Sequence, residues 1–164
     1  YRNDRFLRGG DHTPYVQRGY AAVRFTEMNE NYTRQHQDVR IENGIQYGDL
    51  ETYIDYEYMR KNTGLNLANL ANLAKAPATP DSVKMDVRRL SNNSFLYWQK
   101  PRTGKVKGYY VLVRETTSAF WQKKIFTTET EMRLPYSKDN YFFGVQAVNE
   151  TGNESIPVVP LPGR

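Results

Sequence analysis

A segment with two prolines, APATP at residues 76–80, divides the chain at the point where its hydrophobic period changes. From residue 53 to residue 75, apolar side chains recur at steps of three and four, which predicts a helix. Beyond residue 80 they alternate at every second position, which predicts β-strands. Proline lacks a backbone N–H and cannot continue a helix. We therefore expect two parts, residues 1–76 and residues 77–164.

The predicted helix has an apolar face and charges that match its dipole. Acidic residues are concentrated near its start and Lys75 lies at its end, as the helix macrodipole favours. Its apolar face indicates core packing. The face consists of Met59, Thr63, Leu67, Leu70 and Ala74, widened by Leu73.

Three alternating segments predict that residues 77–164 form an antiparallel β-sandwich. They lie at 95–98, 109–114 and 141–147, and turn-forming residues follow or precede them at 101–104, 137–140 and 149–152. Aromatic residues in these segments each bury about 150–250 Å². The expected fold class of this part is all-β.

Composition limits the partners of the chain. Ten basic and ten acidic side chains cancel in residues 1–76, so the formal net charge of +5 lies in residues 77–164. The basic residues there are scattered, which does not indicate a nucleic-acid surface. No apolar run is long enough to cross a bilayer, and the absence of cysteine excludes disulfides and thiolate zinc clusters. We therefore expect neither nucleic acid nor a membrane as a partner.

The two histidines of the chain lie in short polar segments near its start. His12 follows Asp11, and His36 lies in the segment RQHQD at residues 34–38. A β-type run, AAVRF, lies between them at residues 21–25. Imidazole and carboxylate groups are typical of zinc hydrolases. Taken alone, two separated histidines are more often without a chemical role.

A resemblance to a known family lies in DHTPY at residues 11–15 and RGYAAV at residues 18–23. These segments resemble the Asp-His-x-x-Phe…Gly-x-Pro-Ala block of the di-zinc aminopeptidase family. That family also includes aminopeptidase Y, glutamate carboxypeptidase and the glutaminyl cyclases. The resemblance covers residues 1 to about 76 and implies a C-terminal fragment of an α/β catalytic domain, with its last strand and helices.

The resemblance also implies roles for four residues. His36 would be a zinc ligand, and Asp11 would act in catalysis within the carboxylate hydrogen-bond network beside the metal. His12 would brace that segment, and Gln35 would stand next to the ligand. The other ligands and the general-base Glu of the family belong to upstream sequence, so this chain is expected to be inactive alone.

A second resemblance covers residues 78–160 and indicates a fibronectin type III domain. It lies in LYWQKP at 96–101, GYYVLVR at 108–114 and YFFGVQAVNETG at 141–152. It implies that Trp98, on strand B of the family, is a core residue. It also implies that Tyr141 is the tyrosine-corner residue, whose hydroxyl bonds to the backbone upstream. Both roles are structural.

Together the two resemblances imply the C-terminal portion of a zinc-dependent, aminopeptidase-like metallopeptidase, which we expect to be secreted or periplasmic. Its substrate in the full-length enzyme would be a peptide with a free N-terminus, and its necessary partners would be the upstream catalytic residues. Two departures favour an alternative, a non-catalytic binding or spacer module with a degenerate peptidase remnant. Gln35 stands where Tyr or Trp is usual, and Asp38 follows His36 by two residues where the family's carboxylate follows by four. A third reading, a glutaminyl cyclase, would have Trp in place of Gln35.

Overall fold

Two compact units make up the chain, residues 1–64 and residues 65–164. The computed structural model describes residues 9–27 and 29–163. The division falls inside the longest helix, α2, which spans Tyr56–Lys75. In the part of the chain that the structure describes, no helix has the length and apolar character needed to span a membrane.

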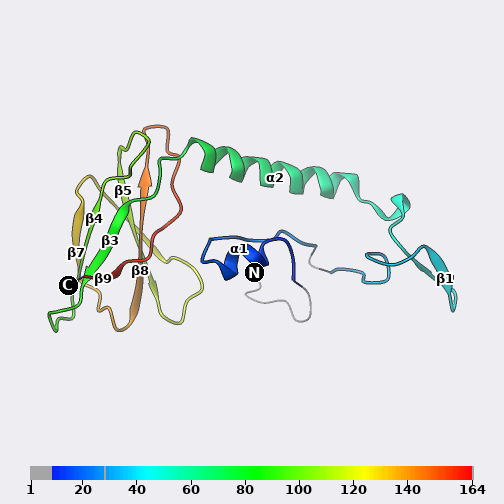
Figure 1. Ribbon diagram of the computed structural model, residues 1–164, viewed down its shortest axis with the longest axis horizontal. Helices are drawn as coiled ribbons and strands as arrows, with labels where there is room; N and C mark the ends of the chain where they lie inside the picture. Colours follow the sequence, from blue (N-terminus) through cyan, green and yellow to red (C-terminus); the bar gives the residue numbers. More distant parts are fainter. Residues whose placement is uncertain (1–8, 28, 164) are drawn as a thin grey trace. The chain divides into compact units, whose positions relative to one another are not determined.

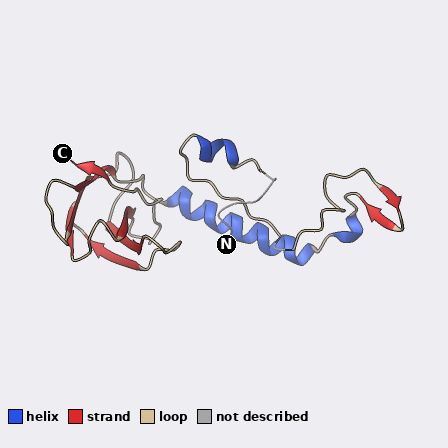
Figure 2. Cartoon of the chain, turned by 90° about the horizontal axis from the view of Figure 1, so that it is seen from below, coloured by secondary structure: helices blue, strands red, loops and turns tan. Residues whose placement is uncertain are grey.

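The first unit contains little regular structure. Its elements are a short helix α1 (Thr13–Gln17), a hairpin of β1 (Arg40–Glu42) and β2 (Ile45–Tyr47), a 3₁₀ turn η1 (Glu51–Tyr53) and the beginning of α2 (Figure 2). The hairpin turn is Asn43-Gly44, and both residues have positive φ angles, 51° and 76°. Asn-Gly favours this tight turn because its twist matches that of the paired strands.

Residues 21–25 form no strand, although their composition is of β type. Val23 is 72% exposed and Phe25 is 44% exposed. A strand needs a neighbouring strand that pairs with its backbone N–H and C=O groups. The described part of the chain pairs no strand with these residues, so the α/β sheet implied by the peptidase resemblance is not shown.

Helix α2 begins three residues later than the sequence predicts and ends at Lys75, as predicted. The Asp55 carboxylate accepts a hydrogen bond of 2.9 Å from the backbone N–H of Tyr58, and this cap sets the start of the helix. The expected core packing of its leucine face is not found, because no residue of α2 is buried. Leu67 and Leu70 are each 65% exposed.

The second unit is a β-sandwich of two sheets that follows α2 (Figure 1). One sheet has the order β7-β4-β3-β9, and its strands are Glu131–Leu134, Ser94–Gln99, Asp81–Asp86 and Leu161–Gly163. The other has the order β6-β5-β8, with strands Lys123–Thr127, Gly108–Glu115 and Tyr141–Val148. All pairings are antiparallel except that of β3 with β9. The predicted sandwich is therefore confirmed.

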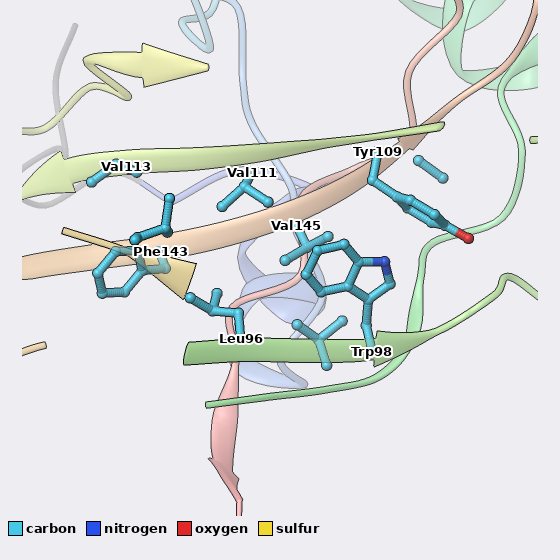
Figure 3. Close-up of a cluster of buried hydrophobic side chains, with 10 residues drawn as sticks. Leu96, Trp98, Tyr109, Val111, Val113, Phe143 and Val145 are labelled. Atoms are coloured by element: carbon cyan, nitrogen blue, oxygen red, sulfur yellow. The ribbon is translucent and has the colours of Figure 1, made fainter. Parts of the chain in front are cut away.

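The hydrophobic core lies between these two sheets (Figure 3). Side chains from β4 point toward those from β5 and β8, in the alternation that the sequence predicts. Trp98 is 4% exposed, and its ring meets that of Tyr109 edge-on at 5.4 Å. The other labelled members are Leu96, Val111, Val113, Phe143 and Val145.

Tyr141 begins β8 at the edge of this core. Its ring lies 5.1 Å from that of Tyr136, and its backbone N–H donates to the Ser137 carbonyl. Among the described residues, no hydrogen bond from the Tyr141 hydroxyl is present, so the bond implied by a tyrosine corner is not seen. Its contact with the core comes from the ring.

Candidate functional site

The Asp11-His12 segment is held by backbone contacts at the start of α1. Thr13 and Gly10 bond to each other, through the Thr13 N–H to the Gly10 carbonyl at 2.9 Å and the Gly10 N–H to the Thr13 hydroxyl at 3.2 Å. Pro14 lies in the first turn, where a missing N–H costs nothing. Asp11 is exposed, so its carboxylate faces solvent in this chain.

The His12 ring is partly enclosed by neighbours that sequence reasoning missed. A Cβ placed on Gly10 would lie 3.0 Å from His12 Nδ1 and 3.1 Å from the Arg24 side chain. Arg24 also donates a 2.9 Å hydrogen bond to the Gly9 carbonyl. Nδ1 of His12 is buried and has no hydrogen-bond partner among the described residues. A buried polar atom without a partner is costly, so this nitrogen is a candidate for a contact outside the described residues.

His36 lies in the loop before the β1–β2 hairpin, with a backbone in the left-handed region at φ 55°. This conformation is uncommon for residues other than glycine and marks positions that the surrounding structure constrains. The Asp49 carboxylate accepts a long, 3.4 Å hydrogen bond from the His36 backbone N–H. The side chain of His36 is exposed, which leaves the imidazole accessible as a ligand.

Gln35 is fixed more firmly than His36. Its amide nitrogen donates a 3.2 Å hydrogen bond to the Glu30 carboxylate, which also accepts a bond from Thr26. On the other side of the loop, the Arg34 guanidinium stacks 3.8 Å from the centre of the Tyr53 ring. These contacts orient the loop backbone around His36 without using its imidazole.

The predicted site residues do not assemble into a metal site in the described part of the chain. No three histidine, aspartate or glutamate side chains there form a group that could hold a metal ion. A catalytic zinc needs about three protein ligands. The residues present therefore do not fit a complete zinc site by themselves, and at most they supply part of one.

The first unit also lacks the buried core that normally holds a site rigid. In its described residues, only Gly48 is buried. Large apolar side chains remain open to solvent, and Tyr20 at 65% and Ile41 at 75% are examples. The first unit therefore does not bury its large apolar side chains within its own described residues.

Sequence reasoning could not find Arg24 and Asp49 as neighbours of the two histidines. Arg24 stands in a run that resembles a strand, and Asp49 is thirteen residues from His36. The glycine at position 48, directly before Asp49, is the one residue in the sequence that indicates this turn. Its φ of 103° and its close approach to Val39 require a glycine, which fixes the turn that presents the Asp49 carboxylate.

Three curated relatives show what the chain is similar to. It is 45% identical over 164 residues to a probable zinc metalloprotease of Leptosphaeria maculans. It is 44% identical over 164 residues to one of Pyrenophora tritici-repentis and 43% identical over 169 residues to one of Pyricularia oryzae. Each match includes 99% of this chain but only 38%, 34% and 34% of the respective relative. The chain thus has zinc metalloprotease homologues over its whole length and spans little more than a third of theirs.

Solved structures match about half of this chain. No protein-family model matches the chain. A solved structure described as "Crystal Structure of FN3tt" covers 52% of this chain and 90% of that chain at 19% identity and a TM-score of 0.42. Another, "Titin kinase and its flanking domains", covers 51% of this chain and 16% of that chain at 27% identity and a TM-score of 0.42.

Proposed function

We propose that this chain is the C-terminal portion of a zinc-dependent, aminopeptidase-like metallopeptidase that hydrolyses peptide bonds. One observation carries the proposal: homologues named probable zinc metalloprotease match 99% of the chain at 43–45% identity. Because the chain spans about a third of those homologues, the remaining two thirds would provide the missing catalytic residues. The 164-residue chain alone would then have no peptidase activity.

The lack of a buried core in the first unit supports the proposal that other residues complete the catalytic domain. It contains both histidines but has no buried apolar core within its described residues. Its exposed apolar side chains would be covered by the rest of the catalytic domain, and so would the leucine face of α2. The burial of such surface contributes about 25 cal/mol per Å², which would stabilise the assembled domain.

Within that domain we assign His36 as a zinc ligand, because its imidazole is exposed in a constrained loop. Asp11 would act in the hydrogen-bond network beside the metal, and His12 would brace this segment with its ring against Gly10. Gln35, bonded to Glu30, would hold the ligand loop in place. A bound zinc would supply an activated water for attack on the peptide carbonyl.

The same proposal includes the substrate, the location, the accessory domain and the partners of the enzyme. The substrate would be a peptide with a free N-terminus, and the enzyme would be secreted or periplasmic. Residues 77–164 would form the accessory fibronectin type III domain, with its boundary at Pro77. No nucleic acid and no membrane would be needed as a partner.

A second candidate function is a non-catalytic spacer or binding module. The observation that favours it is that the sandwich holds the whole buried core identified in the described residues, from Val83 to Ala147. In this case residues 1–76 would be a degenerate remnant, consistent with Gln35 in place of an aromatic residue. The two candidates differ in whether the longer protein binds zinc and cleaves peptides.

The decisive test uses the longer protein with single substitutions in the two histidine segments. His36→Ala should lower both zinc content and hydrolysis of a peptide amide by more than about 100-fold, because a ligand matters more than its outer-shell partners. His12→Ala is the matched control and should retain zinc. Asp11→Asn should keep the metal and slow turnover.

Three results would contradict the assignment. If His12→Ala released zinc while His36→Ala kept it, the ligand would be His12. If the unmodified longer protein bound no zinc and cleaved no peptide, the spacer function would replace the enzyme. Zinc-dependent cleavage by the 164-residue chain alone would refute its dependence on other residues.

A further inference from the structure

Four Asn-x-Ser/Thr sequons occur in the chain, at Asn31, Asn92, Asn149 and Asn153. Such sequons accept N-linked oligosaccharides in hosts that glycosylate secreted proteins. The sugar is attached to the side-chain nitrogen Nδ2, so the surroundings of this atom decide whether a sequon is compatible with the fold. The structure separates the three sequons of the second unit into two kinds.

Asn149 uses its side chain to cap the end of helix α2. Its Nδ2 donates a 2.9 Å hydrogen bond to the carbonyl of Lys75, the last residue of α2. The last carbonyls of a helix have no partner within it, so this bond satisfies one of them. The Oδ1 atom accepts three further bonds, from the N–H of Thr151 at 3.1 Å, from its hydroxyl at 2.9 Å and from the N–H of Asn153 at 2.9 Å.

Asn153 makes a second contact with the same helix. Its Nδ2 donates a 3.2 Å hydrogen bond to Oδ1 of Asn72, one turn before the helix end. Its own Oδ1 lies 2.7 Å from the Thr151 hydroxyl, whose single proton is shared between the Oδ1 atoms of Asn149 and Asn153. The Nδ2 atoms of both sequons therefore point at α2, and a sugar on either nitrogen would occupy the space at this junction.

The surrounding chain fixes this junction further. Pro77 is buried, and a Cβ on Gly104 would lie 2.7 Å from its Cα. Ala78 donates its backbone N–H to the Thr103 carbonyl at 3.1 Å. The end of α2 is thus joined to the sandwich by several close contacts.

The side chain of Asn92 has different surroundings from those of Asn149 and Asn153. It lies between β3 and β4, its side chain is exposed, and no hydrogen bond of that side chain is found among the described residues. A hollow of about 340 Å³ adjoins it, lined also by Leu90, Ser91, Lys138 and Asp139. Leu90 is fully exposed. An apolar side chain beside charged groups suits a sugar ring, which has an apolar face and a rim of hydroxyls.

We propose that Asn92 carries an N-linked glycan whose first sugars lie against Leu90, whereas Asn149 and Asn153 are unmodified in the folded protein, in which their amides bond to α2. In the reaction, Nδ2 forms a bond to the anomeric carbon of a lipid-linked oligosaccharide diphosphate. The lipid diphosphate leaves, and Nδ2 loses one proton to the transferase. The proposal requires entry into a secretory pathway but does not depend on peptidase activity.

The test is site-resolved peptide mapping of the longer protein, secreted from a glycosylating eukaryotic host with a secretion leader. Enzymatic deglycosylation in isotopically heavy water marks each former glycan site as heavy aspartate. The expected result is a mark at Asn92 in most molecules and none at Asn149 or Asn153. Asn92→Gln should remove the mass of one glycan and leave secretion intact.

Two results would overturn the proposal: an unmodified Asn92, or a mark at Asn149 or Asn153 in the secreted protein. The contact with Leu90 has its own test. Native deglycosylation at Asn92 should be faster in Leu90→Ser than in the parent, because the sugar loses its apolar support. Equal rates would refute the position of the glycan against Leu90.

Discussion

Residues 9–64 and the sandwich of residues 81–163 contain similar aliphatic and aromatic side chains but use them in opposite ways. In the sandwich, Val145 and Leu96 are fully buried, whereas Val23 in the first unit is 72% exposed. The sandwich completes its own core by pairing strands that the chain itself provides. The first unit leaves large apolar side chains exposed in its described residues, which supports the proposal that it is part of a larger catalytic domain.

The largest expected effect lies in the core of the sandwich. Trp98→Ala should lower the free energy of unfolding by about 3–5 kcal/mol, because it leaves a cavity between the sheets. Trp98→Phe is the control and should cost less, since the indole N–H is buried without a partner in the described residues. Denaturant unfolding of the 164-residue chain, followed by circular dichroism, measures both. Equal losses for the two variants would contradict this account of Trp98.

A matched pair of valines compares the two regions directly. Val145→Ala should cost about 1.5–3 kcal/mol, because Val145 is fully buried. Val23→Ala should change the unfolding free energy of this chain by less than about 0.5 kcal/mol, as expected for an exposed side chain. In the longer protein, however, Val23→Ala should become destabilising. If it stayed neutral there, the proposed cover over residues 21–25 would be absent.

A smaller loss of stability is expected when the bond between Asn149 of the sandwich and the end of α2 is removed. Asn149→Ala should cost about 1–2 kcal/mol, because it removes a donor to Lys75 and an acceptor for the following turn. Asn93→Ala, an exposed change elsewhere in the sandwich, is the control. Amide exchange at the end of α2 should increase in Asn149→Ala alone. Unchanged exchange there would show that the junction does not depend on this side chain.

The sandwich was predictable from the sequence because apolar side chains alternate along its strands, and the chain itself buries them between the two sheets. The predicted alternating segments correspond to β4, β5 and β8 only, so β3, β6, β7 and β9 were missed. The last of these, Leu161-Pro162-Gly163, has no strand pattern and pairs with the distant strand β3. The sequence also predicted burial for the leucine face of α2, which is exposed here. The leucine face of α2 would be buried, as predicted, only if another surface covered it.

The candidate site was predictable only in part. The histidine segments were found from residue types and a family resemblance, but their surroundings depend on long-range contacts. The Asp49 carboxylate bonds to the His36 backbone from thirteen residues away. Arg24, in a run that was expected to be a strand, lies against Gly10, as His12 does. Neither contact leaves a periodic signal in the sequence, so pattern reasoning could not identify it.

Amide hydrogen exchange, measured on the 164-residue chain alone and within the longer protein, tests the central claim most directly. Exchange rates report local opening, which is rare in a packed core and frequent where few apolar contacts exist. The account predicts slow exchange in strands β3–β8 in both samples. Residues 9–55 should exchange fast in the chain alone and slowly in the longer protein. Equal protection of residues 9–55 in both samples would contradict the proposal that this region is completed by the rest of a longer protein.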